Sequence, residues 1–250
     1  MQILLANAKI MFGSSETKPL TEPLFQSIAN RLAAEMAACS VDMLAQKLDC
    51  SHNLAAENWR RDQNYFLADK MPAIMAYNGQ AYKHLKAKTL SEEDLLFGQK
   101  HLWITCFLYG LLRPLDGIHP YRLEGHIELP SSEGKRLFDF WKTRLTDLLI
   151  NTVKADDGIL IHLSTEEFEH LFDWKRVTTE VQVIQPIFYV RKGDSFKVQA
   201  VWAKSCRGAM ARFLLTQQIT NPAELSAFDY EGFHFLREEN NQLIFVKRAD

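Results

Sequence analysis

The sequence predicts one α/β (mixed α+β) domain over residues 1–250, in which helices flank a mixed β-sheet. Short apolar runs such as Ile3–Ala6 and Ile159–Leu163 are typical of buried strands, and segments of helical periodicity separate them. Near the C-terminus, alternating segments come in pairs joined by polar turns, which is typical of hairpins. Strands that alternate with helices and also pair in hairpins favour a mixed sheet.

The first half of the chain is predicted to be mostly helical, with two short strands. Lys9 follows the first strand at its carboxyl end, where sheets of this kind tend to face ligands. Thr21 and Pro23 mark the first helix start, and Ser91 with Asp94 resembles a capping box. The predicted strands are Ile3–Ala6 and Ala73–Ala76, and the predicted helices are Leu24–Met36, Val41–Leu48, Asn53–Ala68 and Ser91–Phe97.

The second half is predicted to contain one long amphipathic helix, a strand and two hairpins. The long helix buries Leu137, Trp141, Leu145 and Leu148, and its opposite side is basic, either solvated or in contact with nucleic acid. Ser164 with Glu167 is expected to cap a short helix. The remaining predicted elements are the strand Ile159–Leu163, the hairpin of Val181–Val190 with Phe196–Ala203, a helix from Lys204 to Ile219, a helical turn at Asn221–Pro222, and the hairpin of Gly232–Leu236 with Gln242–Val246.

The stretch Gln99–Gly125, QKHLWITCFLYGLLRPLDGIHPYRLEG, is expected to organise the rest of the domain. An apolar run over Leu102–Leu108 precedes five glycines and prolines at short intervals, which indicates a buried element followed by an ordered sharp bend. The bend presents Arg113, Asp116, His119, Tyr121, Arg122 and Glu124. The two arginines either bind a ligand or hold the bend by pairing with Asp116 and Glu124.

The amino-acid composition limits the classes of protein to which the chain can belong. A hydrophobic share of 47% with 24% charged residues is that of a globular chain. The four cysteines form no close pair, so no zinc site or redox pair is expected. The first residues lack the features of a signal peptide, and no apolar run is long enough for a bilayer, so a cytoplasmic location without membrane association is expected.

Positive charge is concentrated between Pro186 and Gln218, although the formal net charge of the chain is −2. Lys204, Arg207 and Arg212 are expected in the first turns of a helix that follows a strand. Helix N-termini attract anions, so cations placed there call for a compensating phosphate or carboxylate. Gly208 would let a ligand or another backbone approach closely.

No catalytic constellation stands out. The histidines are scattered, no cofactor or metal motif occurs, and none is expected. Glu166 and Glu167 follow a strand and could act as acid and base, or simply cap a helix. Cys106 and Cys206 are either reactive thiols or inert, with Cys206 the better candidate because basic residues flank it.

The central stretch also carries a resemblance. The pattern HLxxxxxLYGxLRPLDxxxPYRLE resembles the signature of the YaaA family of bacterial peroxide-stress proteins. A second block, with Lys204, Arg207–Gly208 and Arg212–Phe213, matches the same family, and Ala8–Lys9 fits the end of its SPAK motif. The resemblance covers nearly the whole chain.

The resemblance implies a mixed α/β fold that includes a helix-hairpin-helix element and a positively charged cleft. It also implies binding of double-stranded or structured DNA, and protection during hydrogen peroxide stress by limiting free iron and the DNA damage that iron promotes. A helix-hairpin-helix contacts the phosphate backbone without reading bases. The chain departs from the family pattern at several positions: Ala6, Asn7, Gln80, Trp103, Cys106, Phe107, His162 and Phe168.

Together these observations predict a protein that binds DNA phosphates with little sequence preference. The residues expected to line its cleft are Lys9, Arg113, Arg122, Lys204, Arg207 and Arg212. Two alternatives remain open. One is an enzyme acting on a nucleotide or nucleobase in the same cleft, with Glu166 or Glu167 as acid or base. The other is a stress-response interaction protein whose cleft is structural.

Overall fold

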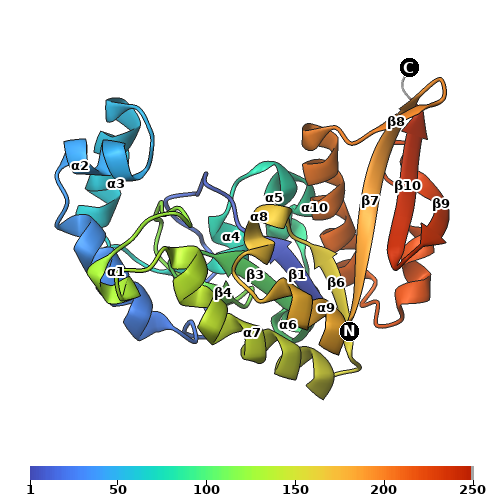
Figure 1. Ribbon diagram of the computed structural model, residues 1–250, viewed down its shortest axis with the longest axis horizontal. Helices are drawn as coiled ribbons and strands as arrows, with labels where there is room; N and C mark the ends of the chain where they lie inside the picture. The colour runs from blue at the N-terminus through green and yellow to red at the C-terminus, as the bar shows by residue number, and fades with distance from the viewer. Residues whose placement is uncertain (249–250) are drawn as a thin grey trace.

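An eight-stranded mixed sheet runs through the centre of the computed structural model, which describes residues 1–248 (Figure 1). The strands are β1 (Gln2–Ala6), β2 (Met71–Pro72), β3 (Leu102–Cys106), β4 (Gly110–Leu112), β5 (Gly117–Ile118), β6 (Ile159–Leu163), β7 (Gln182–Lys192), β8 (Ser195–Lys197), β9 (His234–Glu239) and β10 (Gln242–Arg248). The α-helices are α1 (Gln26–Ala37), α2 (Val41–Lys47), α3 (His52–Gln63), α4 (Ala73–Ala76), α5 (Gln80–Leu85), α6 (Glu92–His101), α7 (Leu137–Ala155), α8 (Glu166–Glu169), α9 (Trp174–Glu180) and α10 (Ala200–Thr216). Three 3-10 helices are η1 (Ala87–Thr89), η2 (Pro130–Ser132) and η3 (Pro222–Ala227).

The strand order is β4-β3-β1-β6-β7-β10-β9, with β8 paired to β7, while β2 and β5 form a separate pair. The five strands from β3 to β10 in this order run parallel, and β4, β8 and β9 are antiparallel to their neighbours. Parallel strands are usually covered on both faces, which is why β1, β3 and β6 are almost continuously apolar.

Helices cover both faces of this parallel core. Helix α10 packs against α5, α6, β1 and β7, and α7 with α9 lies over β4, β6 and β7 (Figure 1). The approach of α10 to α5 is very close at Gly208, where an added Cβ would lie 1.8 Å from the carbonyl oxygen of Ala81. A glycine is therefore required here. Of the two alternatives that the sequence left open, a ligand or another backbone, the structure places the backbone of Ala81 against Gly208.

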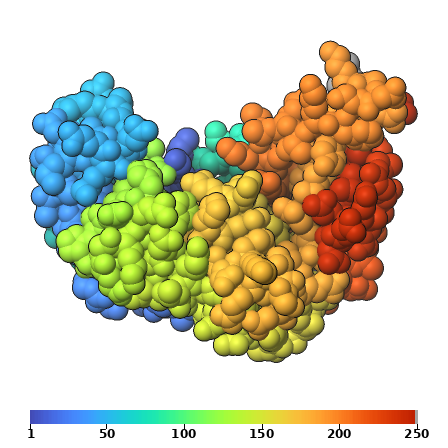
Figure 2. All heavy atoms as spheres, viewed as in Figure 1, coloured from blue at the N-terminus to red at the C-terminus, as the bar shows by residue number. Residues whose placement is uncertain are grey.

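Helices α1, α2 and α3 project from the β4 end of the sheet as an arm (Figure 1). The space-filling view shows the molecule hollowed between this arm, in blue, and the rim formed by the ends of β7, β8 and α10, in orange (Figure 2). The segment that follows β1 and the region of α5 are seen between the two rims (Figure 2).

Most sequence predictions of the elements are confirmed. The mixed α/β class is correct, as are β1, β6, the hairpin of β9 and β10, and the helix with Leu137, Trp141 and Leu145 buried. The capping box at Ser91 is present, since Asp94 N–H donates to Ser91 Oγ (3.1 Å) and Ser91 N–H donates to Asp94 (2.9 Å). Helix α6 then continues beyond Phe97 to His101.

One predicted strand is wrong, and a second was predicted too long. Ala73–Ala76 forms the single helical turn α4 directly after the two-residue strand β2, because a run of four apolar residues fits a buried turn as well as a strand. The strand predicted over Phe196–Ala203 ends at Lys197, and α10 begins at Ala200 instead of Lys204. The first turn of α10 thus takes residues whose alternation suggested a strand, and Ala203 becomes part of the buried face of the helix.

Two predicted caps are also wrong. Helix α1 begins at Gln26, and Thr21 instead donates its hydroxyl to Asp116 (2.6 Å). Ser164 is fully buried, with its hydroxyl 3.5 Å from that of Thr105, and α8 begins after Thr165 without a side-chain cap. In both cases a tertiary contact takes the side chain that local spacing assigned to a cap.

The central bend is held mainly by hydrogen bonds to neutral groups. Asp116 is 2% exposed and accepts the backbone N–H of Arg113 (2.7 Å) and the hydroxyl of Thr21. Gln99 completes the bend by accepting the N–H of Leu115 (2.7 Å). The expected pairing of the Arg113 side chain with Asp116 is absent within residues 1–248, whereas Arg122 does pair with Glu124 (3.2 Å).

No helix among the described residues is long and apolar enough to span a bilayer.

The arm contains a buried carboxyl group without a hydrogen-bond partner for one of its oxygens. Asp62 of α3 is 6% exposed, and its Oδ2 bonds to no group in residues 1–248. Burial raises the pKa of Asp62 from 3.8 to about 7, and the nearby Arg61 lowers it only in part. The side chain is thus neutral in the folded arm at mildly acidic pH.

This gives a prediction for Asp62→Asn. Between pH 4 and 7 the unfolded chain loses the Asp62 proton first, so stability falls as pH rises and the full penalty, about 4 kcal/mol, applies above the folded pKa. The asparagine variant should remove this pH dependence and be more stable than wild type at pH 8, measured by urea unfolding from pH 4.5 to 8. Asp69→Asn, at an exposed site, should keep the wild-type profile, and an unchanged profile in Asp62→Asn would contradict the assignment.

Candidate functional site

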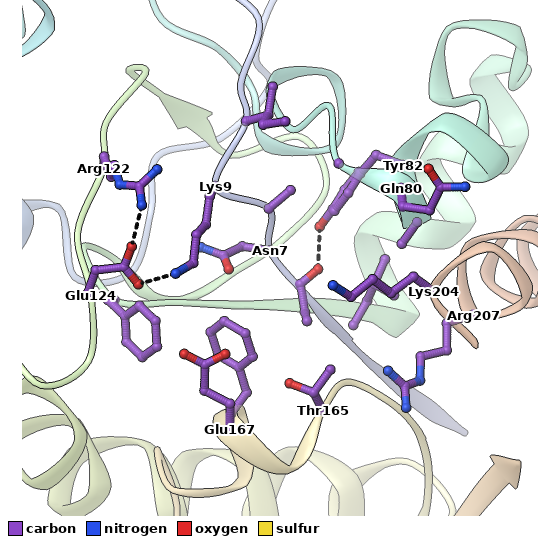
Figure 3. A pocket seen from close by; sticks show the side chains of 18 of the residues that line it. Asn7, Lys9, Gln80, Tyr82, Arg122, Glu124, Thr165, Glu167, Lys204 and Arg207 are labelled. Carbon is purple, nitrogen blue, oxygen red and sulfur yellow. Dashed lines mark hydrogen bonds and ion pairs between the residues drawn. The ribbon is translucent and has the colours of Figure 1, made fainter. Parts of the chain in front are cut away.

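A pocket of about 340 Å³ lies at the carboxyl ends of β1, β3 and β6 (Figure 3). The chain leaves these strands at Asn7, Phe107 and Ser164, and the following residues form much of the wall. The start of α5, the segment Tyr121–Glu124 and one side of α10 complete it. Lys9, which follows β1, lines this pocket, and its contact with a ligand stays a prediction.

Tyrosine hydroxyls fix the position of the strand ends. Tyr82 donates its hydroxyl to the carbonyl oxygen of Ala6 (3.0 Å). Asn7 donates from Nδ2 to the hydroxyl of Tyr121 (3.1 Å), which also bonds the hydroxyl of Tyr77 (3.0 Å). Burial raises the pKa values of Tyr77, Tyr82 and Tyr121 well above their usual value, so these phenols stay neutral and act as hydrogen-bonding groups.

At one end of the pocket, two cations share a buried carboxylate. Glu124 is 5% exposed and lies 2.8 Å from Lys9 Nζ through Oε2 and 3.2 Å from Arg122 through Oε1. The contact from Arg122 Nη2 lacks hydrogen-bond geometry, so Glu124 Oε1 accepts no hydrogen bond from residues 1–248. Arg122 Nε, a different atom of the guanidinium, also has no partner there. This end therefore carries a net charge of +1 and has hydrogen-bonding capacity left over.

At the other end, Lys204 and Arg207 of α10 face the pocket (Figure 3). Neither lies within 4 Å of a carboxylate oxygen in residues 1–248, in contrast to Lys9 and Arg122. Burial lowers the pKa of the half-buried Arg207 from its usual value, because the charged guanidinium loses solvation. Since α10 begins at Ala200, these cations lie in its second turn, and the pocket contacts side chains and not the helix N-terminus.

The remaining two expected cations lie elsewhere. The guanidinium of Arg113 lies over the ring of Trp103, 4.9 Å from its centroid. Arg212 donates to the carbonyl oxygens of Leu85 (3.2 Å) and Lys86 (3.3 Å) and so closes the end of α5. The structure thus brings together four of the six predicted residues, Lys9, Arg122, Lys204 and Arg207, and gives Arg113 and Arg212 packing and capping contacts.

The two candidate acid/base residues are separated. Glu167 lines the pocket between the two cationic ends, beside Thr165 (Figure 3). Glu166 instead lines a shallow depression with Lys142 and His170. Only Glu167 is placed to contact a ligand bound with these cations.

Five of the eight departures from the family pattern lie in the pocket and three do not. The five that line it are Ala6, Asn7, Gln80, Phe107 and Phe168. The rings of Phe107 and Phe168 stack with centroids 4.9 Å apart. Gln80 Nε2 donates to Ser205 Oγ (2.8 Å), which holds it against α10. Outside the pocket, Cys106 is fully buried, Trp103 lies under the guanidinium of Arg113, and His162 contacts Glu169 (2.8 Å). The altered residues therefore make one wall of the pocket apolar.

Sequence reasoning placed Glu124 in the bend but not in the site, and it missed Tyr82 and Thr165. The sequence signal that could have placed Glu124 in the site was its position in the predicted bend, two residues after Arg122. Tyr82 gave no signal, because only the packing of α5 against β1 brings it to the pocket.

The thiols and metal ligands form no site in the described part of the chain. Cys106 and Cys206 are fully buried, and burial raises their pKa values to about 11 and about 12. Of the two alternatives for these cysteines, reactive or inert, the burial and the raised pKa values favour inert thiols. No group of three or more histidine, cysteine, aspartate or glutamate side chains in residues 1–248 is arranged to hold a metal ion.

Comparison with known proteins identifies relatives along the whole chain. Residues 1–239 match the family model of the peroxide stress protein YaaA. A UPF0246 protein of Bacteroides thetaiotaomicron is 42% identical over 252 residues, with 98% of both chains covered. A UPF0246 protein of Phocaeicola vulgatus is 44% identical over 240 residues, with 94% of each chain covered.

The thiol environments give a prediction for chemical labelling. At pH 8 in the folded protein, Cys106, Cys206 and the buried Cys39 should react with a maleimide at least 100-fold more slowly than in 6 M guanidinium, because they are buried and their raised pKa values keep them protonated. Half-buried Cys50 should label first. Peptide mass spectrometry reads out each site, and rapid labelling of Cys206 in the folded state would contradict the inert assignment.

Proposed function

The chain belongs to the family of the peroxide stress protein YaaA, and from this premise we propose that it binds DNA phosphates during peroxide stress. It binds with little sequence preference and protects the bound DNA from damage that iron promotes. The DNA lies across the hollow between the α1–α3 arm and the rim of β7, β8 and α10 (Figure 2).

The observation that carries this proposal is a set of cations with no internal partner beside the hollow. Lys192, Lys197, Lys204 and Arg207 belong to the β7–β8–α10 rim, and none lies within 4 Å of a carboxylate oxygen in residues 1–248. Elsewhere many basic side chains are paired, as Lys135 and Arg144 are with Glu133. Unpaired cations gathered on one rim give a local positive potential in a chain whose net charge is −2.

On the opposite rim, we assign the expected helix-hairpin-helix to α2 and α3. These helices pack against each other and are joined by Leu48–Ser51, where Asp49 has a φ of 44°. Ser51 caps α3 by accepting the N–H of Leu54 (3.4 Å), which leaves the earlier N–H groups of the first turn for a phosphate oxygen. Backbone amides on one rim and side-chain cations on the other suit a polyanion that spans both.

The test is the salt dependence of duplex binding. If the four rim cations each neutralise one phosphate, the logarithm of the association constant should fall with the logarithm of salt concentration with a slope of about −4, measured by fluorescence anisotropy. Arg207→Ala should weaken binding equally for unrelated sequences and reduce the slope by about 1.

Arg237→Ala is the matched control, since Arg237 is paired with Glu239 (3.2 Å) on β9, and it should leave both quantities near wild type. Failure to retain a duplex at low ionic strength, or retention that does not depend on salt, would overturn the proposal.

A second candidate function is favoured by one observation, the placement of Glu167 in the pocket. An enzyme acting on a nucleotide could bind its phosphate at Lys204 and Arg207 and use Glu167 as acid or base. Glu166 provides the matched control, because it is adjacent in sequence but lies outside the pocket.

For this candidate, nucleotides that raise the melting temperature are tested for turnover. Glu167→Gln should lower kcat at least 100-fold, and Glu166→Gln should leave kcat unchanged. Equal loss in both variants, or no turnover of any nucleotide that binds, would exclude Glu167 as the acid or base.

A further inference from the structure

The pocket contains buried polar atoms that the fold leaves unsatisfied. Glu124 is 5% exposed, and its Oε1, although 3.2 Å from Arg122 Nη2, accepts no hydrogen bond from residues 1–248. Arg122 Nε, on the same wall, donates none. A buried polar atom without a partner is costly, so such atoms on a pocket wall indicate a ligand group that completes them. That group must present a hydrogen-bond donor next to an acceptor.

The second requirement comes from the opposite end. Lys204 and Arg207 carry two positive charges with no carboxylate within 4 Å in residues 1–248, and Figure 3 shows both side chains at the end away from Glu124. A phosphate suits this pair. The charges differ at the two ends, because Glu124 offsets one of the two charges of Lys9 and Arg122. One end thus favours an anion and the other a polar group of little charge.

The apolar wall of the pocket and the volume of the pocket set the third requirement for the ligand. Phe107, Phe168 and Leu123 form an apolar wall that suits a flat ring. The volume of about 340 Å³ is at the lower end of the range for small-molecule pockets. A duplex cannot enter such a space, whereas one nucleotide has the required ring, polar edge and phosphate.

We propose that the pocket receives a single unpaired nucleotide of the bound DNA. Its base lies against the Phe107 and Phe168 wall with its polar edge at Glu124, and its phosphate binds Lys204 and Arg207. This inference rests on the proposed DNA binding and adds a preference for duplexes that carry an unstacked base. Unpaired bases are the easiest to place in a pocket, because they have already lost their pairing.

The experiment compares three duplexes of one sequence by fluorescence anisotropy: fully paired, with one bulged nucleotide, and with an abasic tetrahydrofuran residue at the bulge. The bulged duplex should bind about 10-fold more tightly than the abasic one, because only the former supplies a base. A 2-aminopurine at the bulge should also change its fluorescence on binding.

Glu124→Gln separates base recognition from phosphate binding. The variant should lose the 10-fold preference, yet bind the paired duplex as well as or better than wild type, because one negative charge is removed. Glu128→Gln makes the same change at an exposed position and should keep the preference. Melting curves establish that each variant is folded.

The two proposals fail in different ways. Equal affinity for the bulged and abasic duplexes, in a protein that retains DNA in a salt-dependent manner, overturns the nucleotide pocket and leaves the proposed function standing. Retention of the preference in folded Glu124→Gln also overturns the pocket assignment. Loss of all salt-dependent DNA binding overturns the proposed function and with it this inference.

Discussion

The parallel alignment of β3, β1 and β6 is the constraint on which the rest of the site depends. It brings three strand ends, far apart in the sequence, to one edge of the sheet, so that residues after Ala6, Cys106 and Leu163 share a single pocket. Helix α10 can then supply Lys204 and Arg207 to the same place only because Gly208 lets it lie against the backbone of Ala81. A side chain at that glycine would separate the two helices and move the cations away from the strand ends.

Electrostatically, the site is uneven. Glu124 pairs with Lys9 and Arg122 at one end, so a buried carboxyl group lies between two cations there. At the other end Lys204 and Arg207 have no such partner in the described chain, so an incoming anion is attracted to one place and not to the whole cleft. The proposed binding of a polyanion through one rim is therefore compatible with a formal net charge of −2, because the attraction is local.

The fold was predictable where a pattern was long or strongly marked. The strands Gln2–Ala6 and Ile159–Leu163, the capping box at Ser91 and the final hairpin all carry local signals that agree with their tertiary environment. Prediction failed for Ala73–Ala76, because four apolar residues fit a strand or a helical turn. It also failed for the start of α10, because the alternation of the short strand β8 was taken to continue to Ala203. Thr21 and Ser164 failed as caps because distant partners, Asp116 and Thr105, take their hydroxyls.

By itself, the sequence determined the family, the mixed α/β class, and the existence of a basic segment between Pro186 and Gln218, because each is written in local composition or in ordered motifs. Only the tertiary structure decided which cations form a site. Arg113 and Arg212 have the same side chain as Arg122 and Arg207, but the first two lie on Trp103 and on the end of α5. The physical reason is that convergence depends on strand order and helix packing, which join residues about 200 positions apart, and no local pattern encodes that geometry.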